Sequence, residues 1–195
     1  MPLIHPQVYP PREDTYLLLD AALQEIHPGD HVLEVGCGSG YIAAGLAEYA
    51  RVLATDINPY AVRETRMRGV DVVRSDLLRG IRGPFDMVLF NPPYLPTSED
   101  ERMNDWLEHA LNGGPDGCRV IAEFAAGVAQ VLAPGGRVLL LFSSLTGPER
   151  VIDLFVKEGF ECETFVEKNV EGETLSVIRC KVVLKKMDNK GNPVD

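Results

Sequence analysis

The stretch HVLEVGCGSGYIAAGLAEYARVLAT, residues 31–55, decides the fold. Its first five residues form a largely apolar run that predicts a buried strand, and GCGSG follows at 36–40 as a tight glycine loop. Residues 41–49 predict a helix, and residues 51–55 predict a second strand. A strand, a glycine loop, a helix and another strand make a β–α–β unit, whose two strands run parallel in one sheet.

The alternation of strands and helices continues through the rest of the chain. Further helices are predicted at about 14–26, from Pro59 after an Asn58 cap, at 119–132 and at 149–158. Further strands are predicted at 70–74, 85–90 and 137–143, with two more at 160–168 and 174–184 around a turn at 171–173. The predicted fold class is α/β: a mostly parallel seven-stranded sheet with helices on both faces and a final antiparallel strand.

Length and composition indicate a single domain. The 195 residues are 45% hydrophobic, enough for one substantial core, which we place within residues 1–184. The polar residues 185–195 are expected to be a frayed tail. No apolar run approaches the roughly 20 residues of a membrane span. The N-terminus also lacks the apolar region of a signal peptide.

Charge and cysteine content narrow the functional classes. The formal net charge of −10 disfavours broad electrostatic attachment to nucleic acid. Cys37, Cys118, Cys162 and Cys180 lie far apart with no C-x-x-C pair, which argues against a metal site or a disulfide framework. A reduced, cytoplasmic protein is therefore expected.

The glycine loop and Glu34 indicate the kind of ligand that the sheet holds. In a parallel sheet, ligands bind beyond the carboxyl ends of the strands, where the strand order reverses. Tyr41 occupies the position of the third glycine in a dinucleotide fingerprint, and a Glu34 carboxylate would repel a pyrophosphate. The same carboxylate would attract a cationic amino acid moiety, which favours S-adenosylmethionine over NAD. The alternative is that Glu34 is an exposed residue on an edge strand.

Two aspartates end the next strands. Asp56 closes the second strand and is placed to accept both hydroxyl hydrogens of a ribose. Its alternative role is a helix cap, although Asn58 is better placed for that. Asp76 follows the third strand and could accept an adenine amine beside Leu77. A solvated turn aspartate is the competing interpretation of Asp76.

The fourth strand ends in Asn91-Pro92-Pro93-Tyr94. Pro92 restricts Asn91 to an extended backbone, and neither proline has an N–H to donate. The expected corner offers the Asn91 side-chain oxygen and a backbone carbonyl as acceptors, with Tyr94 as a flat wall. Such a corner suits a planar NH₂ group of a carboxamide, an adenine or a cytosine. A proline-rich turn without a ligand is the alternative.

Assembled, these residues resemble the class I S-adenosylmethionine-dependent methyltransferases, which have a Rossmann-like fold. The narrower resemblance is to the HemK/PrmC group, which methylates the glutamine of the GGQ motif in translation release factors. The chain is most similar to the short archaeal and eukaryotic branch, which lacks the bacterial N-terminal helical domain. The segments that carry it are VYPPREDT (8–15), LEVGCGSG (33–40), TDINP (55–59), LFNPPY (89–94), NGGPDG (112–117) and GETLS (172–176).

The resemblance implies a cofactor, S-adenosylmethionine, with S-adenosylhomocysteine as product, and no metal. Residues 1–30 would cover the cofactor site. The implied cofactor-binding residues are Thr15, Glu34, Gly36, Gly38, Asp56, Ile57, Asp76, Leu77 and Asn91, and the implied catalytic residues are Asn91, Pro92, Pro93 and Tyr94. Thr15 could equally be a helix cap, or both. Loop 112–117 is expected either to close over the substrate or to be a flexible surface loop. Trp106 is expected to be a core residue rather than a substrate-side wall.

The implied activity is methylation of a release-factor glutamine. The N-P-P-Y motif is shared with adenine-N6 DNA methyltransferases and some RNA methyltransferases, so a nucleic-acid amine is an alternative acceptor, as is a protein lysine. A non-catalytic cofactor-binding subunit is the alternative outside enzymes. The resemblance also implies a small zinc-binding activator protein. Strand 70–74, with Val70, Val72 and Val73 at a sheet edge, is its expected pairing site.

Overall fold

The computed structural model describes residues 4–97 and 105–183 of the chain, so the predicted tail at 185–195 lies outside the described residues. The helices are α1 (Glu13–Glu25), α2 (Tyr41–Leu46), α3 (Pro59–Met67), α4 (Glu108–Leu111), α5 (Arg119–Val128) and α6 (Pro148–Lys157), with a 3-10 turn, η2 (Ser144–Thr146). The strands are β1 (His31–Val35), β2 (Arg51–Asp56), β3 (Asp71–Arg74), β4 (Phe85–Phe90), β5 (Leu132–Ser143), β6 (Phe160–Val170) and β7 (Glu173–Val182).

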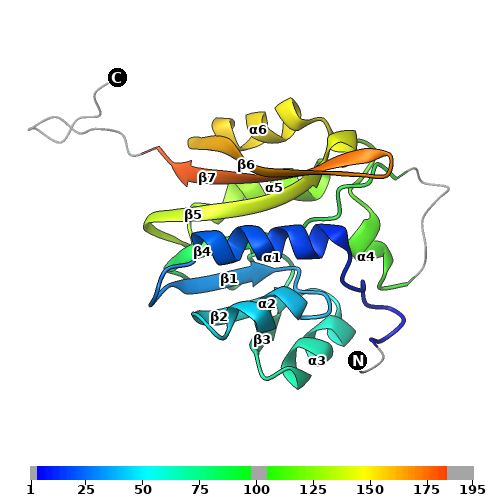
Figure 1. Ribbon diagram of the computed structural model, residues 1–195, viewed down its shortest axis with the longest axis vertical. Coiled ribbons are helices and arrows are strands. Elements are labelled where there is room, and N and C mark those ends of the chain that lie inside the picture. Colours follow the sequence, from blue (N-terminus) through cyan, green and yellow to red (C-terminus); the bar gives the residue numbers. More distant parts are fainter. Residues whose placement is uncertain (1–3, 98–104, 184–195) are drawn as a thin grey trace, which may run out of the picture.

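One sheet of seven strands spans the described part of the chain, in the order β3-β2-β1-β4-β5-β7-β6. The first five strands pair in parallel, whereas β7 runs antiparallel to both β5 and β6. The predicted mixed α/β sheet is therefore confirmed. The chain builds outward from β1 to β3 and then returns to β4 on the other side of β1, so the strand order reverses between β1 and β4 (Figure 1). Val35 pairs with Phe90 there, which places the ends of the two strands side by side.

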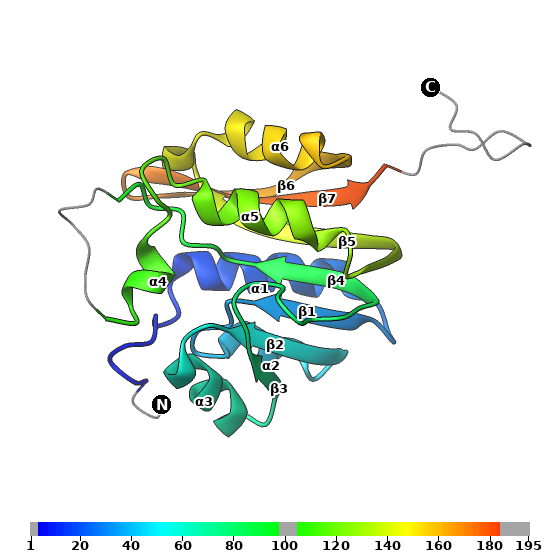
Figure 2. The same ribbon diagram turned by 180° about the vertical axis from the view of Figure 1, so that it is seen from behind.

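Helices cover both faces of the sheet. Helices α1, α2 and α3 contribute to a core on one face (Figure 1), and α5 and α6 contribute to a core on the other (Figure 2). Because successive side chains of a strand point to opposite faces, Val32 joins the first core while Leu33 and Val35 join the second. Glu34 therefore shares the face of Val32, towards α1 and α2.

Most predicted boundaries agree with the structure, and two differences have clear causes. Helix α2 ends at Leu46 rather than at Tyr49, because the last residues tighten into a turn in which the Tyr49 N–H donates to the Leu46 carbonyl. Strand β5 begins at Leu132, which was predicted to end the helix at 119–132; that helix, α5, ends at Val128. Leu132 pairs with Phe85 and Arg137 with Met87, so residues 133–136 bulge from the strand, where proline and glycine are tolerated.

The expectation of four unpaired cysteines is wrong for two of them. Cys162 on β6 and Cys180 on β7 are directly opposite in the antiparallel pair and form a disulfide. Their separation of 18 residues in sequence gave no sign of this, because pairing depends on the hairpin register. Cys37 and Cys118 are buried free thiols.

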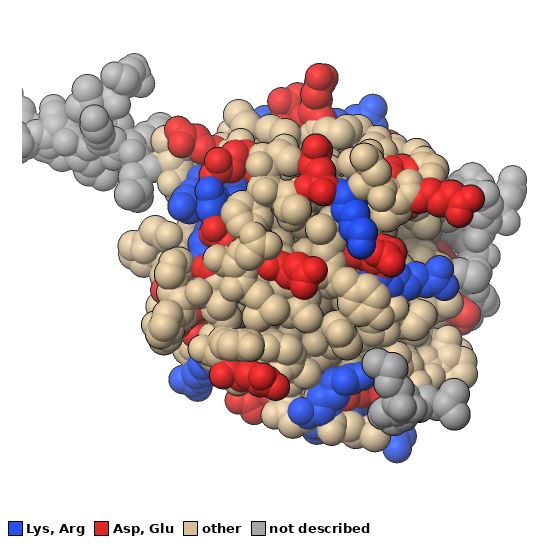
Figure 3. Space-filling view, in the orientation of Figure 1, with Lys and Arg blue, Asp and Glu red and all other residues tan. Residues whose placement is uncertain are grey.

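The surface carries charges of both signs. On the face shown in Figure 3, Lys and Arg side chains are interspersed with Asp and Glu and form no continuous basic stripe. In the described ranges, no helix has the length and apolar character needed to cross a bilayer.

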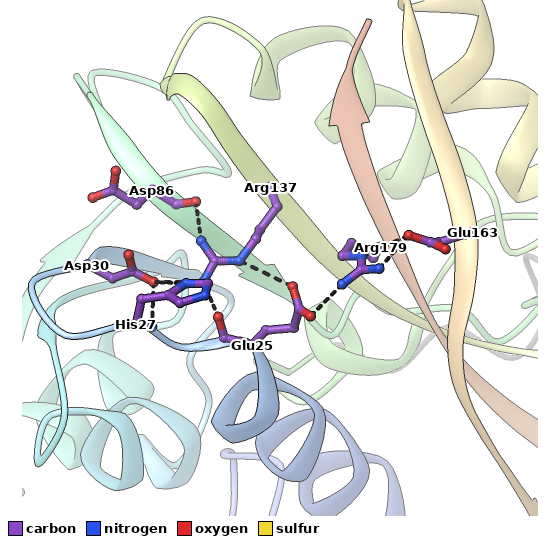
Figure 4. Close-up of polar contacts among 7 residues, drawn as sticks. All are labelled: Glu25, His27, Asp30, Asp86, Arg137, Glu163 and Arg179. Carbon is purple, nitrogen blue, oxygen red and sulfur yellow. Dashed lines mark hydrogen bonds and ion pairs between the residues drawn. The ribbon is translucent and has the colours of Figure 1, made fainter.

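A buried ion network holds the end of α1 to the sheet (Figure 4). Arg137 on β5 is 6% exposed, and its guanidinium donates to the Asp30 carboxylate (2.7 Å) and to the backbone carbonyls of Glu25 and Asp86. Its Nε lies 3.4 Å from the Glu25 carboxylate, an ionic contact without hydrogen-bond geometry. Arg179 on β7 pairs with the same carboxylate. The network lies near the start of β1, whereas the predicted site residues lie at the other end of the strands, beyond their carboxyl ends.

Candidate functional site

A cavity of about 400 Å³ lies at the carboxyl ends of the parallel strands. This volume falls within the range of small-molecule sites. All twelve residues that the sequence analysis placed in the site line this cavity: Thr15, Glu34, Gly36, Gly38, Asp56, Ile57, Asp76, Leu77, Asn91, Pro92, Pro93 and Tyr94. The structure thus brings them together at the switch point, and their individual roles remain predictions.

The glycine loop brings backbone close to the cavity. Gly36 and Gly38 have φ angles of 68° and 51°, in the left-handed region that favours glycine. The Gly38 N–H donates to Asp56 Oδ2 (2.8 Å), which ties the loop to the end of β2. A ligand in the cavity can therefore approach the backbone of the loop without meeting a side chain at these positions.

Glu34 is a buried carboxylate, not an exposed residue of an edge strand. It is 3% exposed on a central strand, and its Oε2 has no hydrogen-bond partner within the described chain. Burial raises the pKa of the Glu34 carboxyl well above its ordinary value, the Ala43 N–H opposes this, and the Asp56 charge adds to it. A buried acceptor without a partner is costly to the fold, which makes it suited to a cationic or hydrogen-bond-donating ligand.

Asp56 is held by the backbone on both sides. Its Oδ1 accepts the Asn58 N–H (2.8 Å) and its Oδ2 accepts the Gly38 N–H. Burial raises the pKa of Asp56, while these two N–H groups oppose the rise. Asn58 is the cap of α3, accepting from the Tyr60 N–H at 2.9 Å, as predicted. The Asp56 carboxylate is thus fixed in direction and keeps acceptor capacity for a ligand.

Asp76 and Leu77 lie at the outer side of the cavity. Asp76 forms a 2.9 Å ion pair with Arg79, and its side chain is 41% exposed, so it meets both the cavity and solvent. Leu77 has a φ of 48°, an uncommon conformation for a residue with a side chain. This turn is braced by Ser75, whose hydroxyl contacts the carbonyls of Leu77 and Arg79.

The N-P-P-Y corner has a defined amide orientation. Asn91 Nδ2 donates to Asp14 Oδ2 (3.1 Å), whereas Asn91 Oδ1 is buried and has no partner within the described residues. The NH₂ end of Asn91 therefore faces Asp14, whose oxygen accepts from it, and the Asn91 oxygen faces away. The predicted acceptor at this corner is therefore present, and no described residue occupies it.

Two tyrosines share the same carboxylate. The hydroxyls of Tyr9 and Tyr94 donate to Asp14 Oδ2 at 3.1 and 3.3 Å. Burial, with the Asp14 charge and hydrogen bond, raises the pKa of both phenols above the ordinary value. Tyr94 was expected only as a flat wall; its hydroxyl also braces the corner against α1.

The backbone of loop 112–117 packs against the N-P-P-Y corner, so the loop is not a free surface loop, and its closure over a substrate stays a prediction. The Gly113 N–H donates to the Leu95 carbonyl, and Asn112 is 7% exposed. A Cβ on Gly113 would lie 2.8 Å from the Pro93 carbonyl oxygen, and one on Gly117 would lie 2.4 Å from that of Tyr94. The glycines let the loop backbone pack directly against the motif.

Sequence reasoning missed Asp14 and Tyr9 and misjudged Trp106. Asp14 had a signal: it shares a helical face with the apolar Leu17, Leu18 and Ala21, so it should be buried. Tyr9 precedes the helix and had no periodic signal. Trp106 is half-buried and lines the cavity, with Arg74 over its ring at 5.3 Å, so it belongs to the wall rather than the core. Thr15 braces the start of α1, where its Oγ1 accepts the Arg12 N–H, and it lines the cavity, so its contact with the cofactor stays a prediction.

Comparisons with known proteins find relatives that match most of the chain. Residues 13–170 match the family model of the methyltransferase small domain. A relative in Methanocaldococcus jannaschii is 40% identical over 183 residues, covering 90% of this chain and 92% of its own, and is named provisionally as a protein N5-glutamine methyltransferase. The human methyltransferase HEMK2 is 35% identical, with 88% of each chain covered.

A solved structure is also similar to this chain. The E. cuniculi Mtq2–Trm112 complex, described as responsible for methylating the translation termination factor eRF1, matches with a TM-score of 0.77 and 30% identity. The match covers 90% of this chain and 99% of the matched chain.

Proposed function

Because the chain belongs to the methyltransferase small domain family, in its HemK2/Mtq2-type branch, we propose that it methylates the glutamine side-chain amide of the GGQ motif in a translation release factor. S-adenosylmethionine is the proposed donor. The observation that carries the proposal is the Asn91 amide, whose NH₂ end is held by Asp14 and whose buried oxygen has no partner in the part of the chain that the structure describes. Such an oxygen suits a substrate N–H.

The proposed transfer depends on how the corner holds the amide nitrogen. An amide nitrogen is a weak nucleophile because its lone pair is delocalised into the carbonyl. Hydrogen bonds from its two N–H groups to Asn91 Oδ1 and the Pro92 carbonyl fix its direction. They also strengthen as positive charge develops on nitrogen, which favours the transition state. When bound, S-adenosylmethionine would supply an electrophilic methyl group; its S–C bond would break, with the electrons left on sulfur, as the N–C bond forms. The amide proton then leaves to water.

The cofactor assignment follows the strand ends. Glu34 would accept from the cationic amino group, Asp56 from the ribose hydroxyls, and Asp76 from the adenine amine beside Leu77. The glycine loop and Ile57 would pack against the nucleoside, and Thr15 would close the site from α1. The Glu34 oxygen, which has no partner among the described residues, and the left-handed glycines Gly36 and Gly38 fit this group.

The test is transfer of a labelled methyl group from S-adenosylmethionine to purified release factor, with the modified residue found by mass spectrometry. We expect label at the GGQ glutamine, loss of label in Asn91→Ala, and cofactor binding that persists in that variant. Gln24→Ala, which removes an exposed amide on α1, is the matched control. Turnover of Asn91→Ala within about tenfold of wild type would contradict the role of the corner.

The same assay decides between acceptors. DNA, RNA and lysine-bearing proteins are offered in parallel, because the corner accepts any planar NH₂ group and a lysine remains a competing acceptor. The net charge of −10 and the mixed charges in Figure 3 favour a protein substrate over nucleic acid. Label found only in nucleic acid or only at lysine overturns the proposal, and binding of the donor with no label anywhere indicates a non-catalytic subunit.

We further propose a small zinc-binding activator protein that pairs with the edge strand β3. β3 is an edge strand, which supports the idea, although only Val73 of the three valines is outward, at 46% exposed, while Val70 and Val72 are buried. Val73→Asp should abolish co-purification with such a partner. If the isolated chain is monodisperse and fully active, this proposal fails. A release factor substrate would place the enzyme in the cytoplasm, which cell fractionation tests.

A further inference from the structure

The hydrogen-bond partners of Asp14 are all donors. Its Oδ2 accepts from Asn91 Nδ2 (3.1 Å) and from the hydroxyls of Tyr9 (3.1 Å) and Tyr94 (3.3 Å). Its Oδ1 accepts from the backbone N–H (2.6 Å) and the hydroxyl (3.2 Å) of Thr15. Asp14 is 4% exposed. A carboxylate is the side chain that accepts on both oxygens, so this position requires its chemistry and not merely its shape.

The two ends of the Asn91 amide have nearly the same shape but opposite hydrogen-bonding character. Pro92 restricts the Asn91 backbone, yet a rotation about the terminal side-chain bond would exchange oxygen and nitrogen. With nitrogen turned to the substrate, two NH₂ groups would face each other and neither would have an acceptor. The orientation of this one amide therefore decides whether the corner can bind a substrate N–H.

We propose that Asp14 is a positioning residue that sets this orientation, acting through Asn91 and not on the substrate. The inference rests on the proposed function, because it assigns Asn91 Oδ1 to the substrate amide. Tyr9 and Tyr94 complete the device by bonding to the same oxygen. Since Asn91 and Tyr94 belong to one motif and Asp14 belongs to α1, the carboxylate joins the first helix to the corner at the end of β4.

Replacing Asp14 by asparagine exposes the requirement. An amide at position 14 has one accepting end and one donating end. If its oxygen faces Asn91, its NH₂ opposes the donating N–H of Thr15; if its NH₂ faces Asn91, the Asn91 amide turns over. Neither arrangement satisfies all the donors, although the shape of the side chain is unchanged.

The experiment compares Asp14→Asn with Asp20→Asn, the same chemical change at an exposed position of the same helix. Methyl transfer to release factor gives kcat and KM, calorimetry gives the affinity for S-adenosylmethionine, and ¹⁵N NMR follows the side-chain NH₂ signal of Asn91. We expect Asp14→Asn to lower kcat by about 100-fold, as removal of one preorganised electrostatic group does elsewhere. Cofactor affinity should stay within about threefold, and the Asn91 NH₂ signal should shift. Asp20→Asn should match wild type in all three.

A second variant separates positioning from general support. Tyr9→Phe combined with Tyr94→Phe removes both hydroxyls but keeps the Asp14–Asn91 bond. We expect it to retain the Asn91 NH₂ signal and to lose less than about tenfold in kcat, since the stronger, charged acceptor remains. A loss equal to that of Asp14→Asn overturns the proposal, because the hydroxyl network rather than the amide orientation would then be responsible.

The NMR measurement also keeps this proposal distinct from the function itself. Wild type that labels no glutamine refutes the proposed function, but the Asn91 signal still reports whether Asp14 holds the amide. Wild type that labels glutamine while Asp14→Asn retains activity within about threefold and an unshifted Asn91 signal refutes the positioning role alone. If Asp14→Asn does not fold, the positioning role is judged from the kcat of the double tyrosine variant and from the Asn91 NH₂ signal of the wild type.

Discussion

Removal of the Arg137 guanidinium tests how strongly α1 is held to the sheet. In Arg137→Met, the carboxylates of Glu25 and Asp30, each 12% exposed in the side chain, lose a shared cation, and the Asp86 carbonyl loses a donor. Taking one partner from a buried ion pair costs about 3–5 kcal/mol. Arg179 still neutralises Glu25, so we expect the lower end, about 3 kcal/mol. For a domain of this size, that lowers Tm by roughly 6–12 °C.

The stability difference between wild type and Arg137→Met should also depend on pH. Burial opposes ionisation of Asp30, but the hydrogen bonds from Arg137 and from the His27 N–H, with the Arg137 charge, lower its pKa below the ordinary 3.8. A carboxyl with a lowered pKa stabilises the fold above about pH 4 and loses that contribution as pH falls through its folded pKa. Wild type should therefore lose stability below about pH 4, and the gap to Arg137→Met should narrow there.

The assay is urea unfolding of both proteins at pH 7 and between pH 4 and pH 3. Arg150→Met is the control, because Arg150 forms a surface ion pair with Asp116 in which both side chains are more than half exposed. Exposed pairs contribute about 0–1 kcal/mol, so the control should stay near wild type. A cost below about 1 kcal/mol for Arg137→Met, or a gap that does not change with pH, would refute the reasoning.

Three further predictions concern the site and the hairpin. Gly117→Ala places a Cβ 2.4 Å from the Tyr94 carbonyl oxygen, so it should lower the free energy of unfolding by about 2–4 kcal/mol and remove most of the activity. The control Gly172→Ala is also at positive φ but in open space, so it should cost about 1–2 kcal/mol of stability and keep activity. Equal effects of the two variants would contradict the packing argument. Glu34→Gln should raise Tm at pH 7 without cofactor, because a carboxyl with a raised pKa destabilises the fold once pH exceeds its unfolded pKa. The same variant should bind S-adenosylmethionine more weakly. Calorimetry measures both quantities, and a lower Tm would argue against an uncompensated charge at Glu34. Reduction of the β6–β7 disulfide, which links residues 18 apart, should lower the free energy of unfolding by about 3 kcal/mol. Urea titrations with and without reductant measure this difference. Equal stability under both conditions would mean that the two thiols are unpaired in solution.

The sequence predicted the elements of the fold because strands buried on both faces and capped helices leave strong local patterns. Phe85–Phe90 is apolar at all positions but Asp86 because helices cover both faces of β4, and Asn58 followed by Pro59 marks the start of α3. The end of α2 and the start of β5 were missed, since the last turn of a helix frays or tightens and the bulge in β5 depends on its pairing with β4.

The same distinction between local patterns and distant contacts applies to the site. Residues at strand ends could be placed from sequence, because parallel strands deliver their carboxyl ends to one edge. Contacts between elements could not: Asp14 meets Asn91 across 77 residues of sequence, and Cys162 meets Cys180 only through the hairpin register. A buried acid on the apolar face of a helix was the one local sign of the first contact.

The charge of the cavity bears on the direction of the proposed reaction. Its described lining includes Asp14, Glu34, Asp56, Asp76 and Glu123, set against Arg119. Such a cavity favours a cationic donor, and that attraction alone would stabilise the ground state and slow transfer. Positive charge leaves sulfur and develops on the amide nitrogen as the methyl group moves. An acceptor must therefore stand at the nitrogen end, and the Asn91 oxygen, backed by the Asp14 carboxylate, is the group placed to follow the charge.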